Sequence, residues 1–173
     1  MILEKFKPCK QDTWEWRLAK LSDIDAIVTL ADSQFTVEVS QFIKTDPHCY
    51  AHNLAHAVIN QNNNPLSEQL IVAVAGNKLY AYAWMQRNQF MPFSVEELAE
   101  ARFVHLDLQL PARTRIHLLA QILQQWEIWC QLCQVKIICS STIRGQQDVF
   151  LRLHEQAGYS VRGSVCFKRL DNV

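Results

Sequence analysis

The chain has 173 residues and a mass of 20.1 kDa, and 49% of its residues are hydrophobic while 20% are charged. This composition is typical of a globular domain and excludes a disordered, collagen-like or coiled-coil chain. Seventeen basic residues balance seventeen acidic ones, so we expect no specific nucleic-acid partner. The length predicts one domain, with residues 1–13 as an N-terminal arm and residues 14–173 as the domain.

The chain contains only four glycines, at positions 76, 145, 158 and 163. No two of them are two residues apart, which excludes the G-x-G element of dinucleotide-binding folds and of kinase-type loops. The longest unbroken apolar stretch, residues 70–75, is far shorter than the roughly 20 residues that span a bilayer. The N-terminus also lacks the hydrophobic segment of a secretion signal, so we expect a cytoplasmic protein without a membrane partner.

The six cysteines are expected to be reduced thiols because no secretion signal precedes them. Cys130 and Cys133 form a C-x-x-C pair inside a helical pattern, and we expect them to pack in the core. A second group has the spacing of a helical metal site: His48, Cys49, His52 and His56. No carboxylate falls among these four side chains, so the group is interpreted as the polar shoulder of a helix and no metal is predicted.

Strand and helix patterns alternate in the first half of the chain. Hydrophobic periodicity predicts a strand over 14–19, helices over 24–31 and 48–60, and strands over 70–75 and 78–85. Ser22 is expected to cap the first helix, and the loop sequence 61–65 is expected to end the second. Gly76 and Asn77 tolerate the positive φ of a tight turn, so the two strands that they join are predicted to form an antiparallel hairpin.

The second half continues in the same way. The predicted elements are an irregular or helical stretch over 93–100, a strand over 102–110, a long amphipathic helix after Pro111, a strand over 135–139, a helix over 149–156 and a closing strand over 159–170. In the strand over 102–110, His105 and Asp107 are predicted to lie on the face that is free for chemistry. The order β-α-α-β-β-β-α-β-α-β predicts a mixed α/β fold, in which helices flank a mostly antiparallel sheet.

This order and several short phrases resemble the GNAT superfamily of acyl-CoA-dependent N-acyltransferases. Residues 16–27 (WRLAKLSDIDAI) are similar to the first strand and capped helix of that family. Residues 151–159 (LRLHEQAGY) are similar to its penultimate helix and the start of the following strand. The strand over 104–111, followed at once by a long helix, resembles the element that holds pantetheine and pyrophosphate. The resemblance implies a GNAT-like fold over residues 14–170.

In that family the pyrophosphate turn reads Gln/Arg-x-x-Gly-x-Gly/Ala, because small residues let backbone amides approach the phosphate oxygens. The corresponding segment, residues 111–120, reads PARTRIHLLA. A motif that starts at Arg113 or at Arg115 puts Ile116 or Leu118 on the first small-residue position. We therefore expect a degenerate acyl-CoA turn. The residues that would surround a bound cofactor are Arg113, Arg115, Ile116, His117 and Leu118.

The resemblance also indicates candidate catalytic residues. His154 takes the position of a Tyr that protonates the departing thiolate in the family, and a His can donate a proton near neutral pH. His105 and Asp107, on the strand face that would line the cleft, are the candidate bases for the amine. Each of the three also has a structural interpretation, as a polar residue on the outside of a helix or of a sheet.

Two functions remain open, and the degenerate turn favours the first. It is a non-catalytic structural or interaction module without a cofactor, which binds protein partners in an oligomer or a larger assembly. The ending over 162–169 resembles small components of short-tailed phages, which predicts a virion or tail protein, and Trp14 and Trp16 beside the arm are its candidate partner-binding residues. The second is an active acetyl-CoA-dependent N-acetyltransferase, with a V-shaped gap between the strands over 102–110 and 135–139.

Overall fold

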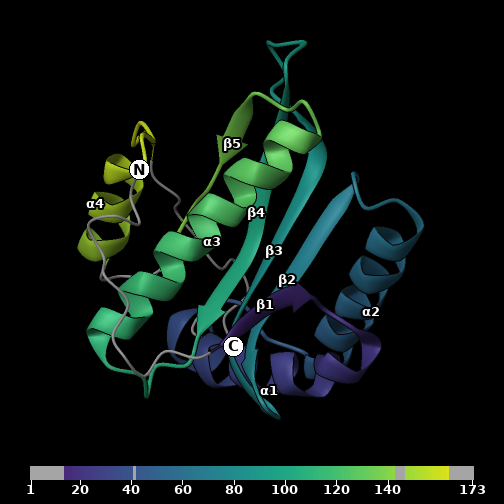
Figure 1. The fold of residues 1–173 in the computed structure, drawn as a ribbon, viewed down its shortest axis with the longest axis vertical. Coiled ribbons are helices and arrows are strands. Elements are labelled where there is room, and N and C mark those ends of the chain that lie inside the picture. Colours follow the sequence, from purple (N-terminus) through teal and green to yellow (C-terminus); the bar gives the residue numbers. More distant parts are fainter. Residues whose placement is uncertain (1–13, 41, 143–146, 164–173) are drawn as a thin grey trace.

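The structure is a computed structural model that describes residues 14–40, 42–142 and 147–163 (Figure 1). A five-stranded sheet in the order β1-β2-β3-β4-β5 forms its centre. The strands are β1 (Glu15–Leu18), β2 (Glu68–Ala75), β3 (Lys78–Phe90), β4 (Glu97–Leu106) and β5 (Ile137–Cys139). The helices are the short 3-10 helix η2 (Leu21–Asp23), α1 (Ile24–Glu38), α2 (Pro47–Asn63), α3 (Ala112–Leu132) and α4 (Asp148–Gln156). Only the β4–β5 pair is parallel among the described strands, which confirms the predicted mixed α/β fold.

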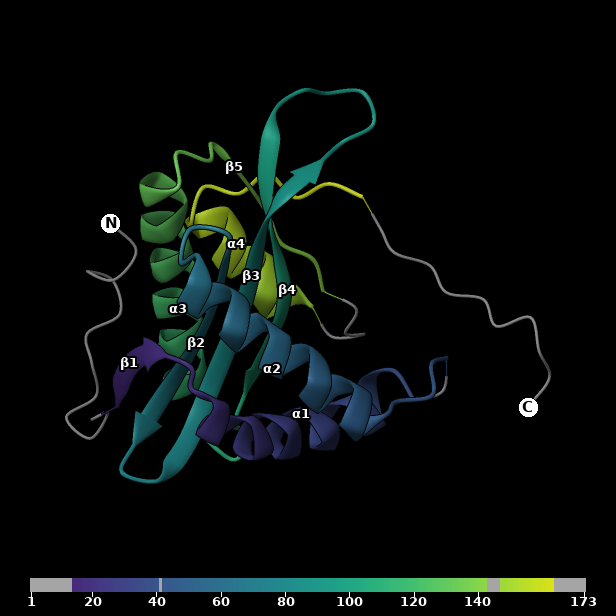
Figure 2. The same cartoon turned by 90° about the vertical axis from the view of Figure 1, so that its right-hand side faces the viewer.

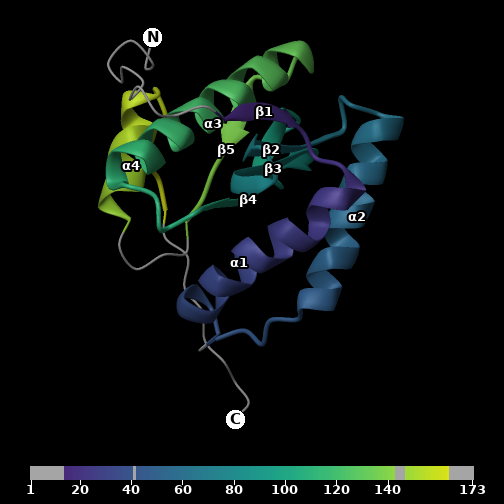
Figure 3. The same ribbon diagram turned by 60° about the horizontal axis from the view of Figure 1, so that its bottom comes forward.

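Helices cover both faces of the sheet. Figure 3 shows α1 and α2 on one face and α3 with α4 on the other. In β2, Leu70 and Val72 pack in the cluster under α1 and α2, whereas Ile71 and Ala73 pack in the cluster under α3. Because both faces are buried, β2 is a nearly continuous apolar run instead of an alternating one.

The hairpin of β2 and β3 is confirmed, with Gly76 at its turn at a φ of +58°. Residues 1–13, the expected arm, lie outside the described residues. Residues 159–163 form no strand, and the rest of the expected closing strand lies outside the described residues. In the described part of the chain, no helix has both the length and the apolar character needed to cross a bilayer.

The start of α1 differs from the expectation. Ser22 does not cap it; the Asp23 carboxylate accepts the Lys20 backbone N–H at 2.7 Å and pairs with Arg17 at 2.7 Å. These contacts form a 3-10 turn that leads directly into α1, so a serine cap has no place there.

α2 begins at Pro47, where Asp46 accepts the backbone N–H groups of His48 and Cys49. It continues to Asn63, past the predicted end at residue 60. The reason is Gln61, which is only 1% exposed. Its amide donates to the Ala19 carbonyl, and its oxygen accepts the Leu70 N–H, each at 2.9 Å. A residue that the sequence places in a loop therefore joins α2 to β2 and to Ala19, which follows β1.

β4 begins five residues earlier and ends four residues earlier than the predicted strand over 102–110. The predicted irregular stretch over 93–100 is wrong in its second half, because Glu97 pairs with Arg87 of β3 at 2.6 Å and draws this segment into the sheet. At the other end, Asp107 accepts the backbone N–H of Gln109, which turns the chain out of the sheet.

Candidate functional site

β4 has an irregularity at Arg102. Trp84 of β3 pairs with Phe103, but the next residue, Met85, pairs with Ala101, so Arg102 is an extra residue in a β-bulge. On the other edge, the described pairing with β5 ends at Glu100, while β4 continues to Leu106. The two parallel strands are thus paired over residues 98–100 of β4 and 137–139 of β5.

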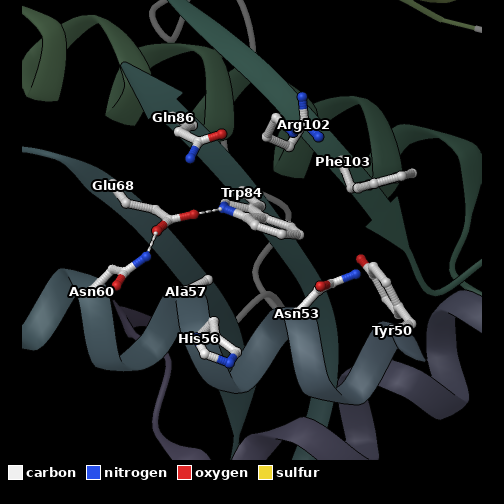
Figure 4. A pocket seen from close by; sticks show the side chains of 10 residues that line it. All are labelled: Tyr50, Asn53, His56, Ala57, Asn60, Glu68, Trp84, Gln86, Arg102 and Phe103. Atoms are coloured by element: carbon white, nitrogen blue, oxygen red, sulfur yellow. Dashed lines mark hydrogen bonds between the residues drawn. The ribbon is translucent and has the colours of Figure 1, made fainter. Parts of the chain in front are cut away.

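A pocket of about 390 Å³ lies beside this bulge, on the sheet face covered by α1 and α2 (Figure 4). We call it the α2–β4 pocket. Its lining residues are Tyr50, Asn53, His56, Ala57 and Asn60 of α2, with Glu68, Trp84, Gln86, Arg102 and Phe103 of the sheet. The sequence alone does not indicate this pocket, because its walls come from four elements that only the folded sheet brings together.

Glu68 is a buried acid in the wall of the α2–β4 pocket and is 3% exposed. One carboxylate oxygen accepts the Trp84 indole N–H at 2.6 Å, and the other accepts the Asn60 amide at 3.0 Å (Figure 4). Among the described residues, no Lys, Arg or His nitrogen lies within 4.0 Å of this carboxylate. The two donors that bind it in the described part of the chain, an indole and an amide, are both neutral.

A chain of hydrogen bonds leads from the pocket to the predicted base His105. The Tyr50 hydroxyl, in the pocket wall, lies 2.7 Å from the Tyr82 hydroxyl, which in turn bonds to His105 Nδ1. His105 Nε2 is 3.8 Å from the Glu38 carboxylate. Burial raises the pKa of Tyr50, which keeps this hydroxyl protonated at neutral pH. The expectation of an open face is wrong, because Phe35 and Glu38 of α1 contact His105, which is only 3% exposed.

Asp107 has a different environment from His105. It follows β4, pairs with Lys78 at 2.9 Å and accepts the Gln109 backbone N–H. Burial alone would raise the pKa of Asp107, but the hydrogen bonds from Lys78 and Gln109 together hold it below its usual value. A carboxylate that is stabilised in its charged form is a weak proton acceptor, and the structure does not place Asp107 in the α2–β4 pocket.

The predicted cofactor-binding residues belong to the first two turns of α3. The helix begins at Ala112, so the backbone N–H groups at its start belong to Ala112, Arg113 and Thr114. Ile116 lies one turn further and packs against the core, and Leu118 is 0% exposed. The branched side chains on which the degenerate-turn hypothesis depends therefore lie beyond the first-turn amides.

The start of α3 fits a bound anion. No side chain caps it, no acidic residue lies in its first turn, and Ala112 is small. Arg113 is exposed, and two buried nitrogens further along, Arg115 Nε and His117 Nδ1, have no hydrogen-bond partner among the described residues. Amides with positive charge beside them are the chemistry that a diphosphate needs.

His154 lies on α4 and contacts the end of β5. Its Nδ1 is 2.8 Å from the Phe150 carbonyl, so the Nδ1–H donates this bond, and its Nε2 is 3.1 Å from the Ser140 hydroxyl. Burial lowers the pKa of His154, although the bond to Phe150 opposes this shift. Neutral His154 therefore accepts from Ser140 through Nε2 and carries no proton there to donate.

The lowered pKa of His154 predicts a pH effect on stability. As the pH falls, the unfolded chain binds this proton near the ordinary histidine pKa of 6.5, whereas the folded chain binds it only at a lower pH. The stability that depends on neutral His154 is therefore complete above pH 6.5 and declines as the pH falls from there to the folded-state pKa. We expect His154→Gln to lose less unfolding free energy between pH 7 and pH 5 than the unchanged protein, measured by urea titration. Equal losses in both would contradict the shift, and the exposed His52→Gln is the control.

Trp14 and Trp16, predicted to bind a partner, lie against α3 of their own chain. Both indole N–H groups donate to the Gln121 side-chain oxygen at 2.8 Å. Trp14 also contacts the ring of His117, with the centroids 5.9 Å apart. These bonds attach the edge strand β1 to the long helix.

The predicted packing of the C-x-x-C pair is confirmed. Cys130 and Cys133 are both buried in the core, and burial raises the pKa of the Cys130 thiol to about 12. On α2, the Nε2 atoms of His52 and His56 are 3.1 Å apart on an exposed surface.

The chain is similar to known proteins in structure and not in sequence. No protein-family model matches it, and no curated protein has a significantly similar sequence. A predicted acetyltransferase with acetyl-CoA from Clostridium acetobutylicum has a TM-score of 0.67 and 14% identity over 91% of this chain and 97% of that chain. Glucosamine-6-phosphate N-acetyltransferase from Arabidopsis thaliana has a TM-score of 0.66 and 11% identity over 92% and 100%. A possible acetyltransferase from Clostridium difficile 630 has a TM-score of 0.65 and 9% identity over 93% and 100%.

These similarities cover nearly the whole chain and define its fold. The chain has the GNAT-like fold of N-acetyltransferases, as the order of its elements predicts. Identities of 9–14% show the fold alone, so the activity has to be argued from the site.

Proposed function

We propose that the protein is an acyl-CoA-dependent N-acyltransferase, whose acceptor amine binds in the α2–β4 pocket. The observation that carries this proposal is the position of the pocket on β4. Arg102 and Phe103 line the pocket at the bulge, and the same strand leads through residues 107–111 to the start of α3, which has no side-chain cap and no acidic residue in its first turn. An acceptor site and a cofactor site thus lie along one strand, at the point where its pairing with β5 has ended.

The residues that would hold acetyl-CoA are those at the start of α3. The amides of Ala112, Arg113 and Thr114 supply N–H donors for a diphosphate, and the side chains of Arg113 and Arg115 supply positive charge. When bound, the cofactor supplies an acyl thioester.

The residues of the chain that move a proton are Tyr50, Tyr82 and His105. An acceptor ammonium has to lose a proton before its nitrogen can attack a carbonyl carbon. In the proposal Tyr50 takes this proton while its own passes to Tyr82, whose proton passes to His105 Nδ1. The Glu38 carboxylate, 3.8 Å from His105 Nε2, stabilises the imidazolium that results. In this proposal His105 is the base, as the sequence predicts, and it accepts the proton through the hydroxyl groups of Tyr50 and Tyr82.

Calorimetric titration with acetyl-CoA tests the cofactor site. We expect a dissociation constant below about 1 mM, and we expect Arg113→Ala to weaken binding by about tenfold because it removes a charge beside the diphosphate. Arg152→Ala on α4 is the matched control, since it removes one exposed arginine elsewhere. Absence of binding at millimolar ligand would contradict the proposal.

The second candidate is the interaction module, in its narrowest form a phage virion or tail component. One observation favours it: the loop between β3 and β4 projects from the sheet (Figure 2), and this loop exposes large apolar side chains. Phe93 is 88% exposed and Val95 is 96% exposed. Such a tip is suited to contact with a protein partner. If acetyl-CoA does not bind and the protein sediments as an oligomer, this candidate is the better one. The phage origin stays a prediction from the sequence.

A further inference from the structure

Two exposed histidines meet on the surface of α2. His52 and His56 are four residues apart, which places both side chains on one side of the helix. Their Nε2 atoms are 3.1 Å apart, and their ring centroids are 4.4 Å apart with an angle of 71° between the planes. The structure thus brings together two members of the histidine and cysteine group that the sequence interprets as the polar shoulder of a helix.

The separation of the two nitrogens fits a single metal ion between them. An imidazole nitrogen binds Zn²⁺ at about 2.0–2.1 Å, so two nitrogens on one ion are about 2.9 Å apart at a right angle and about 3.3 Å apart at a tetrahedral angle. The observed 3.1 Å lies between these values. Both rings can therefore reach one ion from the helix as it stands, when each carries its proton on Nδ1 and directs the lone pair of Nε2 at the ion.

The chemistry of the pair indicates which ions it would bind. Neutral imidazole suits Zn²⁺, Ni²⁺ and Cu²⁺, whereas Mg²⁺ and Ca²⁺ require oxygen ligands. The described part of the chain supplies no group of three His, Cys, Asp or Glu side chains for an ion. A bound ion therefore keeps coordination positions for water, or for an oxygen or nitrogen atom of another molecule. Such open positions distinguish a ligand-binding metal site from a closed structural one.

We propose that His52 and His56 bind a divalent transition-metal ion at the edge of the α2–β4 pocket. His56 is one of the residues that line this pocket (Figure 4), so an ion held between the two rings lies beside it. The ion takes no part in the proposed proton relay, which runs through Tyr50, Tyr82 and His105. The proposed acyl transfer therefore does not depend on this ion, and the ion does not depend on acyl transfer.

Calorimetric titration of the untagged protein with Ni²⁺ tests the site. We expect one tight site per chain, with an affinity about tenfold or more above that of His52→Gln or His56→Gln, because either variant leaves one imidazole in place of two. Mg²⁺ should not compete with Ni²⁺ for this site. Equal affinity in the unchanged protein and both variants, or no saturable binding, would overturn the inference.

A double variant, His56→Gln with Asn62→His, is the matched control. It keeps the number of histidines, but positions 52 and 62 are about 15 Å apart along the helix, which is too far for one ion. We expect it to bind Ni²⁺ as weakly as His56→Gln alone. Binding as tight as that of the unchanged protein would show that the spacing is irrelevant and would overturn the inference. All three changed positions are exposed, so these variants should fold.

Thermal unfolding gives a second measurement. An ion that binds the folded pair and not the unfolded chain stabilises the fold, so Ni²⁺ should raise the unfolding midpoint of the unchanged protein more than that of the single variants. An equal rise in all of them would contradict a site made by the pair. No acyl donor is present in either measurement, so the outcome is independent of acetyl-CoA binding.

Discussion

Replacement of Tyr50 by Phe is expected to lower the rate of acetyl transfer by about 10²-fold or more, which is the usual contribution of general acid–base catalysis. The variant keeps the ring that packs against Phe35 and Phe103 but removes the hydroxyl that joins the pocket to Tyr82. The measurement is kcat with acetyl-CoA and the primary amine that the unchanged protein acetylates best. Because the loss concerns proton transfer, KM should change little.

The pH profile separates a proton relay from a change in packing. A proton relay makes kcat depend on proton transfer along the chain, so Tyr50→Phe should change the dependence of kcat on pH. His105→Gln should give the same profile as Tyr50→Phe, since both break one chain. A Tyr50→Phe variant with unchanged kcat would exclude the relay, even if acetyl transfer itself is found.

Replacement of Gln61 by Leu is expected to lower the free energy of unfolding by about 2–5 kcal/mol. The change leaves the Ala19 carbonyl and the Leu70 N–H without their partner inside the protein, and each unsatisfied buried group costs about 1–3 kcal/mol. Urea unfolding followed by circular dichroism measures the effect.

Two controls show whether the loss comes from these bonds. Asn62→Leu changes the next residue of α2, which is exposed, and should alter stability by less than about 0.5 kcal/mol. Gln61→Glu retains an acceptor for the Leu70 N–H but places a buried carboxylate against the Ala19 carbonyl, so it should destabilise the protein at least as much as Gln61→Leu. A Gln61→Leu variant as stable as Asn62→Leu would show that the buried amide is replaceable.

Local sequence patterns predict the helices, strands and turns that neighbouring residues stabilise. The apolar spacing of α3 places Trp126 and Cys130 in the core, and Gly76 allows the turn of the first hairpin. The resemblance to GNAT proteins adds the layer order, which the structure confirms. The predicted bounds are wrong where a contact with a residue distant in the sequence determines the length of the element. Glu97 becomes part of β4 through Arg87, and Gln61 extends α2 through Ala19 and Leu70.

The candidate site illustrates the same division. Sequence singles out His105 and His154 as titratable residues near the expected cleft, but not their partners. Tyr50 and Tyr82 are 32 positions apart, and Tyr82 and His105 are 23 apart. The register of β3 against β4 places Tyr82 directly beside His105, while Tyr50 of α2 contacts Tyr82 and Phe35 of α1 contacts His105. No motif can encode a contact that depends on the pairing of two strands.

By itself, the sequence determined the class of fold, because hydrophobic periodicity and turn chemistry act over a few neighbouring residues. It also determined the exclusions, since the absence of G-x-G elements can be read without coordinates. Only the tertiary structure decided where the chemistry lies. Glu68, for example, is buried and accepts hydrogen bonds from Trp84 and Asn60. Its burial follows from how the sheet and α2 pack together.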